Sequence, residues 1–330
     1  MTTAAPPSAR RTRTLRLLSQ SGVLVALLLL VLFGALRYDG FLGAYNLSTF
    51  LRYNAMFGLI AVGMCFVIIT GGIDLSVGSV VAMSSVVAAL LSPHGVGTAV
   101  LGGVLAGAAV GLLNGLIITR LNIQPFITTL ATLLAARGLA LLLARNQGGV
   151  GLDPTNTALA WVGQGDLWRL PVPGVILAVV VVAAAVALRL TPFGRHALAT
   201  GGGEDASSLM GLPVDRIKLG VYGLSGALAG LSGVILAAQL GAGQPTEGLG
   251  WELSAIASVV VGGTLLTGGV GSVWATLAGT LLLGLIFNLL NFENGRGVIS
   301  LSPYWQSVIR GGFLLLVVVL QSRAGGSGEP

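Results

Sequence analysis

The sequence predicts an all-α, polytopic membrane protein with about ten transmembrane helices, and composition is the first reason. The chain has 330 residues, of which 54% are hydrophobic and only 8% charged, and its mean hydropathy is +0.92. A soluble domain carries about 25% charged residues, so this chain has too little charge to cover a surface in water. A bilayer-spanning helix needs roughly 20 apolar residues, and the apolar runs are numerous enough for about ten.

The second observation is the order of the apolar runs, which short loops separate. We expect residues 1–20 and 322–330 to be disordered cytoplasmic tails and residues 21–321 to form one transmembrane domain. No small-x-small cleavage site follows the first run, which favours an uncleaved span over a signal peptide. Several spans are short for a full crossing, so we expect some to be broken or tilted. The predicted spans are 21–36, 50–69, 75–92, 96–119, 125–144, 173–190, 219–240, 254–270, 272–291 and 304–321.

The basic residues orient these spans, because cytoplasmic loops carry an excess of Lys and Arg. With the N-terminus inside, an even number of spans also returns the C-terminus to the cytoplasm. The inside then holds Arg10, Arg11, Arg13, Arg16, Arg120, Arg189, Arg195, Arg216, Lys218 and Arg323, against Arg37, Arg52, Arg145, Arg169 and Arg296 outside. The long loop 145–172 faces outward, with its two Trp residues at the membrane interface.

The third observation is an internal repeat. TGGIDLSVGSV at 70–80 matches TGGVGSV at 267–273, and the LN and QPFI of 121–127 are echoed by LN at 290–291 and SPYW at 302–305. Two pseudo-repeated halves with glycine-interrupted segments are a common plan of transporters, with the solute path between the halves.

Two helices carry stripes of small residues. Glycine recurs at every fourth position of the fourth span, at Gly103, Gly107, Gly111 and Gly115, and Gly226 and Gly230 repeat this spacing in the seventh. Lipid supplies no hydrophobic drive between helices, so such stripes indicate close helix packing and say nothing about a solute.

The stretch TGGIDLSVGS places an acid and two serines between two apolar runs. In a structural interpretation, Asp74 or Ser76 caps the third span. In a functional one, Asp74 and Ser76 face a polar path, since an ionised carboxylate at membrane depth costs about 3 kcal/mol in lipid. Both interpretations are compatible, and we expect Asp74 to line the cytoplasmic side of the path.

Further polar or aromatic side chains within the spans are candidates for the same path. Amides offer both donors and acceptors, which suits hydroxyl-rich solutes, although each is also explained by a hydrogen bond between helices. Arg137 and Arg310 either snorkel or pair with Asp74 or Glu252. The remaining path candidates are Asn54, Asn114, Gln124, Phe126, Thr128, Asn288 and Asn291.

The cytoplasmic loop 191–218 contains a predicted short helix, EDASSLM. Glu204 and Asp205 suit a helix N-terminus, Gly211 ends the helix and Pro213 prevents its continuation. A helix of about two turns is marginal alone in water, so it is either an idle surface helix or one that docks on a cytosolic partner.

Several classes of function are excluded. A P-loop needs Gly-Lys-Ser/Thr, but the only lysine lies in Ile217-Lys218-Leu219. No nucleophile–base constellation is visible, and one cysteine, Cys65, with two distant histidines offers no metal site. The sparse bases do not suggest nucleic acid. We therefore expect no catalytic residue, no cofactor and no metal bound by this chain.

The chain resembles the membrane permeases of bacterial ATP-binding cassette (ABC) importers for sugars of the ribose, xylose and galactose type. The resemblance covers roughly residues 45–320, and its most specific stretches are TGGIDLSVGS and GQPTEGLGWELSAIASVVVGG. It also includes GLLNGLIITRLNIQPFITTLATLLAARGLAL and FGRHALATGGGEDASSLMGLPVDRIKLGVYGLSGALAG.

The resemblance implies the ABC importer permease fold in the bacterial cytoplasmic (inner) membrane. The implied partners are an ABC ATPase subunit that binds ATP and Mg, a periplasmic or lipid-anchored sugar-binding protein, and a second permease as homodimer or heterodimer. EDASSLMG then corresponds to the coupling element that docks on the ATPase, with Asp205 in place of an alanine; its residues are Glu204, Asp205, Ala206, Ser207, Ser208, Leu209, Met210 and Gly211.

Two alternatives stay open. One is an ABC permease for a branched-chain amino acid, a nucleoside or a signalling furanoside, since related permeases serve these solutes. The other is a secondary transporter that uses Asp74 as an ion or proton site.

Overall fold

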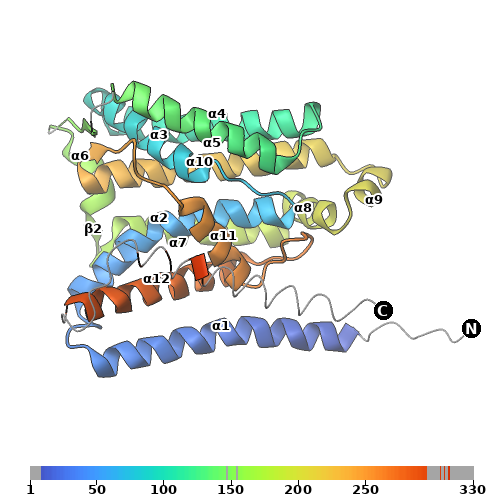
Figure 1. Ribbon diagram of the computed structural model, residues 1–330, viewed down its shortest axis with the longest axis horizontal. Coiled ribbons are helices and arrows are strands. Elements are labelled where there is room, and N and C mark those ends of the chain that lie inside the picture. The colour runs from blue at the N-terminus through green and yellow to red at the C-terminus, as the bar shows by residue number, and fades with distance from the viewer. Residues whose placement is uncertain are drawn as a thin grey trace, which may run out of the picture.

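The computed structural model describes residues 9–145, 148–153 and 155–295, together with Trp305, Val308, Gly311 and Gly312. The long helices run side by side along the long axis of the molecule (Figure 1). The helices are α1 (Ala9–Arg37), α2 (Ala44–Ile69), α3 (Val77–Leu91), α4 (Val96–Arg120), α5 (Pro125–Leu143), α6 (Thr157–Gln164), α7 (Val172–Leu190), α8 (Pro192–Gly202), α9 (Glu204–Leu209), α10 (Val214–Leu240), α11 (Trp251–Val261) and α12 (Val273–Gly295).

Four two-residue strands form two small antiparallel sheets at one end of the bundle. β1 (Val150–Gly151) pairs with β4 (Ala242–Gly243), and β2 (Asp166–Leu167) pairs with β3 (Leu170–Pro171). A 3-10 turn, η1 (Ser92–His94), extends α3 at the same end. The loop 145–172 and α9 therefore lie at opposite ends of the molecule (Figure 1).

The helices agree with the predicted membrane protein. Among the described residues, seven helices are long and apolar enough to cross a membrane, namely α2, α3 with η1, α4, α5, α7, α10 and α12. Gly22–Arg37 of α1 and the whole of α11 are shorter apolar helices. The tenth predicted span, 304–321, lies almost wholly outside the described residues, as does the tail 322–330.

Two predicted boundaries are wrong. The span expected over 254–270 is only the short helix α11, because Gly263, Gly268 and Gly269 adopt positive φ angles of 84°, 87° and 73° that turn the chain. Helix α1 begins at Ala9, so it extends into the segment expected to be a disordered tail.

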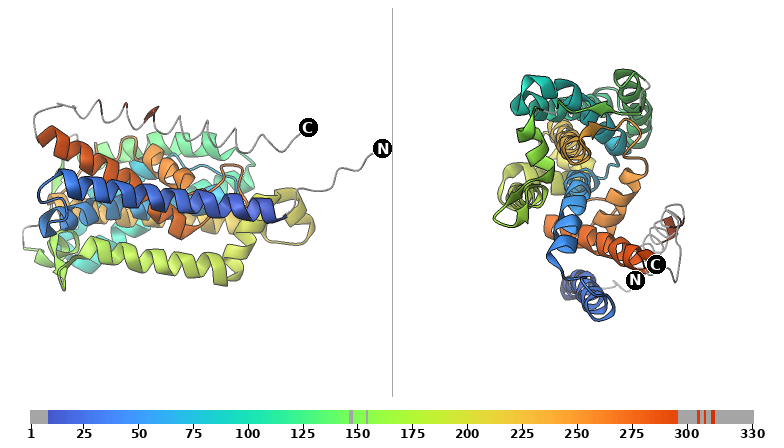
Figure 2. Two further views of the ribbon diagram at one scale, coloured as in Figure 1. Left: turned by 90° about the horizontal axis from the view of Figure 1, so that it is seen from below. Right: turned by 90° about the vertical axis from the view of Figure 1, so that its left-hand side faces the viewer.

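Helices α2 and α10 form the interior of the bundle. Every residue of α2 from Asn54 to Ile69 is buried, as expected of a helix that is apolar all round. Viewed along the long axis, α2 and α10 lie in the middle of the other helices (Figure 2, right). The outer face of α4, by contrast, exposes Leu101 and Leu105.

The two predicted glycine stripes pack against each other. A Cβ atom on Gly107 would overlap the carbonyl oxygen of Gly226, and a Cβ on Gly226 would overlap that of Gly107. One turn further, Gly111 lies equally close to the backbone of Tyr222. Backbone contact along these stripes therefore holds α4 against α10, as membrane helices require in the absence of a hydrophobic drive.

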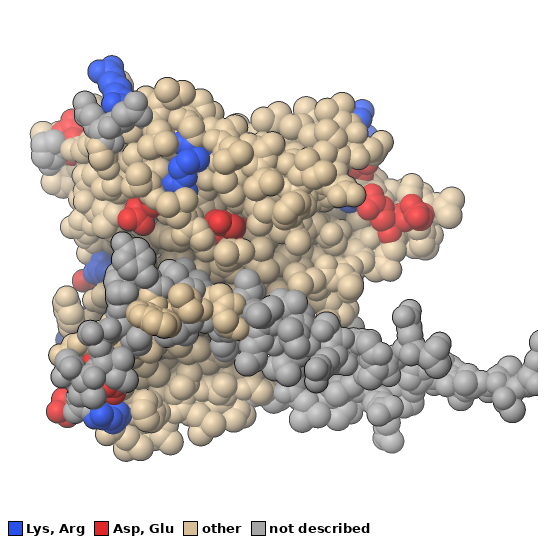
Figure 3. Space-filling view, in the orientation of Figure 1, with Lys and Arg blue, Asp and Glu red and all other residues tan. Residues whose placement is uncertain are grey.

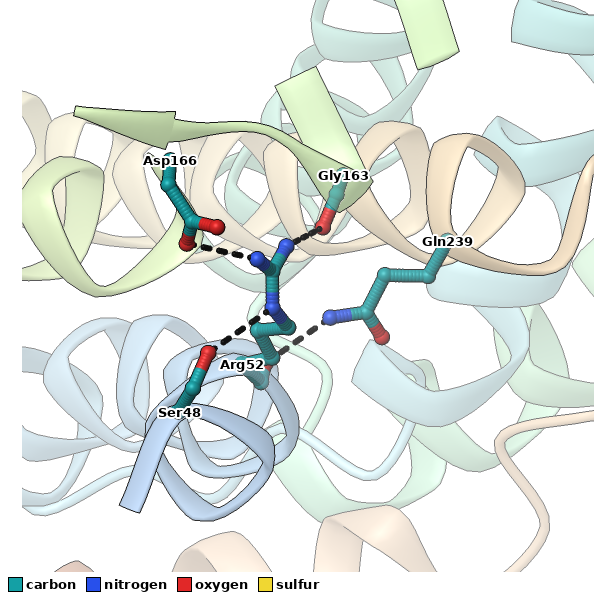
Figure 4. A network of polar contacts seen from close by, with 5 residues as sticks. All are labelled: Ser48, Arg52, Gly163, Asp166 and Gln239. Atoms are coloured by element: carbon teal, nitrogen blue, oxygen red, sulfur yellow. Dashed lines mark hydrogen bonds and ion pairs between the residues drawn. The ribbon is translucent and has the colours of Figure 1, made fainter. Parts of the chain in front are cut away.

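A polar network ties together four elements at the end of the bundle that carries the two small sheets (Figure 4). Arg52, in the third turn of α2 rather than in the loop where the sequence suggested it, lies 2.6 Å from an Oδ1 atom of Asp166 in β2. Its guanidinium also donates to the carbonyl oxygen of Gly163 in α6 and to Oγ of Ser48. Gln239 of α10 donates to the Arg52 carbonyl oxygen at 3.1 Å. Arg52 therefore fixes the connection between α5 and α7, through α6 and β2, onto the two central helices.

We expect Gly107→Ala to lower the unfolding free energy by about 1–3 kcal/mol, the usual cost of overpacking a tight contact. Gly97→Ala is the matched control on the same helix, because a Cβ there meets no atom within 4 Å. Thermal unfolding in one detergent measures both variants. A melting temperature that falls equally in both, or in neither, would contradict the backbone contact between α4 and α10.

Candidate functional site

Helix α9 matches the short helix predicted in the cytoplasmic loop. Its C-terminus has two hydrogen bonds of a Schellman motif, from Gly211 N–H to the Ser208 carbonyl (2.9 Å) and from Leu212 N–H to the Ser207 carbonyl (3.0 Å). Gly211 has a φ of 79°, which explains why glycine stands there. At the other end, Glu204 forms a 2.5 Å ion pair with Lys218 of α10.

The tip of α9 projects from the bundle. Figure 1 shows α9 at the far end of the molecule, beyond α8 and α10. Its Ser207 is buried against the bundle, whereas Leu209 and Met210 are 90% and 70% exposed. Two large apolar side chains held out at the end of a two-turn helix are suited to insertion into a groove of another protein.

Three glycine-containing segments meet next to α9: the end of α8, the TGG turn that follows α2, and the TGG turn at 267–269. The C-terminal turn of α8 contains Gly201, where a Cβ would overlap the carbonyl oxygen of Ile69 at the end of α2. The same carbonyl oxygen accepts a 2.9 Å hydrogen bond from Gly269 N–H, in the second copy of the repeated TGG. At Gly201 the segment that carries α9 therefore makes backbone contacts with both TGG turns, at the end of α2 and at Gly269.

The TGG turn at 70–72 leads into a fully buried polar cluster around Asp74. Oδ1 of Asp74 accepts from Ser76 N–H (3.0 Å) and Ser76 Oγ (2.6 Å), and Oδ2 accepts from Ser225 Oγ of α10 at 2.9 Å. Asn114 of α4 donates to Ser76 Oγ at 3.0 Å. The cluster joins the α2–α3 connection to α4 and α10.

This geometry corrects the expectation that Asp74 or Ser76 caps the third span. Ser76 is the N-cap residue of α3, but neither its side chain nor that of Asp74 caps the first turn; Asp74 accepts from the N-cap residue itself. Asp74, Ser76 and Asn114 are at most 1% exposed, so they lie inside the bundle and line no open path in this structure.

A cavity of about 260 Å³ opens between α2, α11 and α12. Three predicted path residues, Asn54, Asn288 and Asn291, lie in its wall. Their helices are separate in sequence and are brought together by the packing of α12 against α2. The other lining residues are Thr49, Phe50, Tyr53, Phe57, Ser254, Ser258, Thr280, Leu283, Gly284 and Phe287.

Sequence reasoning missed the hydroxyl groups of this cavity. Ser254 and Ser258 are four residues apart and share one face of α11, and Thr280 lines the same cavity from α12. Ser258 and Thr280 donate to carbonyl oxygens of their own helices at 2.9 and 3.0 Å, which satisfies the hydroxyl proton within the membrane. The four-residue spacing of Ser254 and Ser258 was the signal in the sequence that could have predicted a polar helix face.

The predicted residues at the start of α5 lie away from this cavity. Thr128 is buried, whereas Gln124 and Phe126 are exposed. On the same helix, Arg137 Nη1 donates to the carbonyl oxygens of Pro245 and Glu247, both at 2.6 Å. Arg137 thus binds the segment before α11 and does not pair with Asp74; its neighbouring acids are Glu252 and Glu247. Arg310 lies outside the described residues.

The chain belongs to the family described as branched-chain amino acid transport system / permease component, which matches residues 46–318. Ribose import permease protein RbsC of Bacillus subtilis (strain 168) is 40% identical over 304 residues, 92% of each chain. RbsC of Escherichia coli (strain K12) is 37% identical over 319 residues, 96% of this chain and 98% of the relative. L-arabinose ABC transporter permease protein AraH of Azospirillum brasilense is 37% identical over 318 residues, 96% and 91% of the two chains.

No solved structure matches the chain at a significant level. The curated relatives confirm the resemblance to sugar-import permeases, and they class the chain as a transport subunit rather than an enzyme. With the seven long apolar helices, they also support a multi-pass membrane protein.

We expect Asp74→Ala to destabilise the protein by about 1–3 kcal/mol for each buried hydroxyl left without an acceptor. Ser225→Ala removes one of those hydroxyls, so the double variant should lose less stability than the sum of the two single variants. Equilibrium unfolding in mixed detergent measures the cycle. Strict additivity would show that Ser225 and Asp74 do not interact.

Proposed function

We propose that this chain is the membrane-spanning permease subunit of an ATP-driven ABC importer for a monosaccharide of the ribose or arabinose class. The observation that carries the proposal is the full-length similarity to curated ribose and arabinose permeases. ATP and Mg belong to a separate ATPase subunit, because this chain has no P-loop. An external binding protein delivers the sugar, and a second permease completes the membrane unit.

The proposed orientation of the chain in the membrane follows from α9. Its exposed Leu209 and Met210 are the docking contacts for the ATPase, so the α9 end of the bundle faces the cytoplasm. The loop 145–172, at the opposite end, then faces the binding protein. Both termini are cytoplasmic in this arrangement, in agreement with the excess of basic residues on that side.

The cavity between α2, α11 and α12 is the part of the solute path that we propose within this chain. Asn54, Asn288 and Asn291 supply amides, and Ser254 and Ser258 supply hydroxyl oxygens. Such groups both donate and accept hydrogen bonds, which suits a sugar that carries a hydroxyl on most of its carbons.

Reconstitution with an ATPase and a binding protein tests the proposal. Radiolabelled ribose and arabinose are offered to proteoliposomes that lack any ion gradient, and we expect accumulation only with ATP. Uptake that persists without ATP would refute the importer. In a parallel assay, ATP-driven uptake of radiolabelled leucine in place of either sugar would favour the amino-acid alternative. Sugar uptake that fails with ATP but starts once an ion gradient is imposed would favour a secondary transporter.

We expect Leu209→Asp to abolish association with the ATPase, because a charge cannot enter an apolar groove without a large desolvation cost. Leu209→Met keeps an apolar side chain of similar volume and serves as the control. Co-purification of the ATPase with each membrane-inserted variant measures the effect. Full co-purification with Leu209→Asp would exclude the tip of α9 as the docking contact.

A further inference from the structure

Helix α1 lies at the edge of the bundle and leaves a groove beside it. Viewed along the long axis, α1 lies outside the other long helices and next to α12 (Figure 2, right). It packs against α12, and the ring of Phe41 closes on Gly34, where a Cβ would overlap it. Between α1, the start of α2 and α12 remains a cavity of about 120 Å³, whose lining includes Leu27, Val31 and Leu285.

The surface of this groove is almost entirely apolar. Among the described residues that line it, the polar ones are Asn46 and Asn288, and these donate to each other. Asn46 Nδ2 lies 3.2 Å from Asn288 Oδ1, and Asn288 Nδ2 lies 2.9 Å from Asn46 Oδ1. Because the two amides satisfy one another, they do not favour a sugar or water in the groove. An apolar occupant is needed to supply the van der Waals contacts that an empty groove forfeits.

The length of the groove matches one leaflet of a bilayer. Val31 and Leu27 precede Arg37, the last residue of α1, by six and ten residues, which places them about 9 Å and 15 Å along the helix axis. The hydrocarbon core of a bilayer is about 30 Å thick, so one leaflet supplies about half of that. A phospholipid whose phosphate lies level with Arg37 would therefore lay one acyl chain along the groove.

Charged side chains of both signs stand at the end of the groove where Leu42 lines it. Arg37 is about half exposed, and its Nη2 lies 3.6 Å from Oε1 of Glu293 on α12. The same oxygen accepts from the Tyr38 hydroxyl at 2.6 Å, and the neighbouring Asp39 is exposed. Figure 3 shows basic and acidic atoms close together at this end of α1 and α12, on a surface that is mostly uncharged. The described side chains there are one base and two acids.

We propose that this groove binds one acyl chain of a phospholipid whose headgroup carries both a phosphate and a primary ammonium, as in phosphatidylethanolamine. The guanidinium of Arg37 pairs with the phosphate, and the carboxylates of Asp39 and Glu293 accept from the ammonium. A phosphatidylglycerol headgroup would bring a negative charge and no cation to the two acids. A choline headgroup has no N–H to donate.

The bound lipid fills the space that separates α1 from the start of α2, and it joins this outlying helix to the rest of the bundle. The assignment requires only that the chain lies in a membrane, so it does not depend on which solute the chain carries.

Native mass spectrometry of the full chain in a mild detergent tests the headgroup. The protein is incubated with equal amounts of phosphatidylethanolamine, phosphatidylglycerol and phosphatidylcholine that have identical acyl chains. We expect at least about fivefold more bound phosphatidylethanolamine than either other lipid. Asp39→Asn, at an exposed position, should reduce the preference over phosphatidylglycerol at least about twofold. Equal binding of the three lipids to the natural chain would overturn the proposal.

A matched pair of tryptophan variants tests the groove. Val31→Trp fills it from α1, whereas Leu32→Trp adds the same side chain at a neighbouring position that is 55% exposed. We expect Val31→Trp to retain at least about fivefold less phosphatidylethanolamine than the natural chain, and Leu32→Trp to retain as much. Leu47→Trp fills the groove from α2 and should have the same effect if Val31→Trp does not fold. Retention that is equal in the groove-filling and control variants would overturn the groove as the binding site.

Discussion

The structure depends on backbone-to-backbone contact between helices, because lipid provides no hydrophobic driving force for their association. In lipid, an apolar surface gains nothing by leaving the solvent, so attraction must come from close packing and buried hydrogen bonds. This chain meets that requirement with glycine, at Gly107 and Gly226 between α4 and α10 and again at Gly78, whose Cβ would overlap the Gly248 carbonyl. Each contact leaves no room for a side chain, so the helices can separate or slide only as units.

The same constraint explains how α9 can influence the membrane helices. Gly201 brings α8 so close to Ile69 and Gly269 that no flexible side chain lies between them. If α9 docks on an ATPase as proposed, its displacement would be passed to the ends of both repeated segments through these backbone contacts. Glu204 and Lys218 join α9 to α10 as well, so the short helix is attached on two sides.

Local chemistry was predictable from the sequence, and pairing across long sequence distances was not. The acidic residues at the start of α9 and Gly211 just beyond its end predicted this helix. Helix α8 has an equally local signal that was overlooked, since Thr191 caps it ahead of Pro192. The burial of Asp74 depends on Ser225, 151 residues away. Likewise, each glycine stripe predicted tight packing, but only the fold shows that the two stripes meet.

The polar side chains of this membrane domain fall into two groups. Some are buried and bonded only to other buried groups, and others are bonded but also line a cavity. Asp74 receives three donors from two serines and is closed off, which is the arrangement of a group that holds helices together. Asn54 and Asn288 bind neighbouring residues and also lie in the wall of the cavity. A transported sugar must exchange its water for such groups and leave again, so the second arrangement, held in place but open on one side, is the one that a path requires.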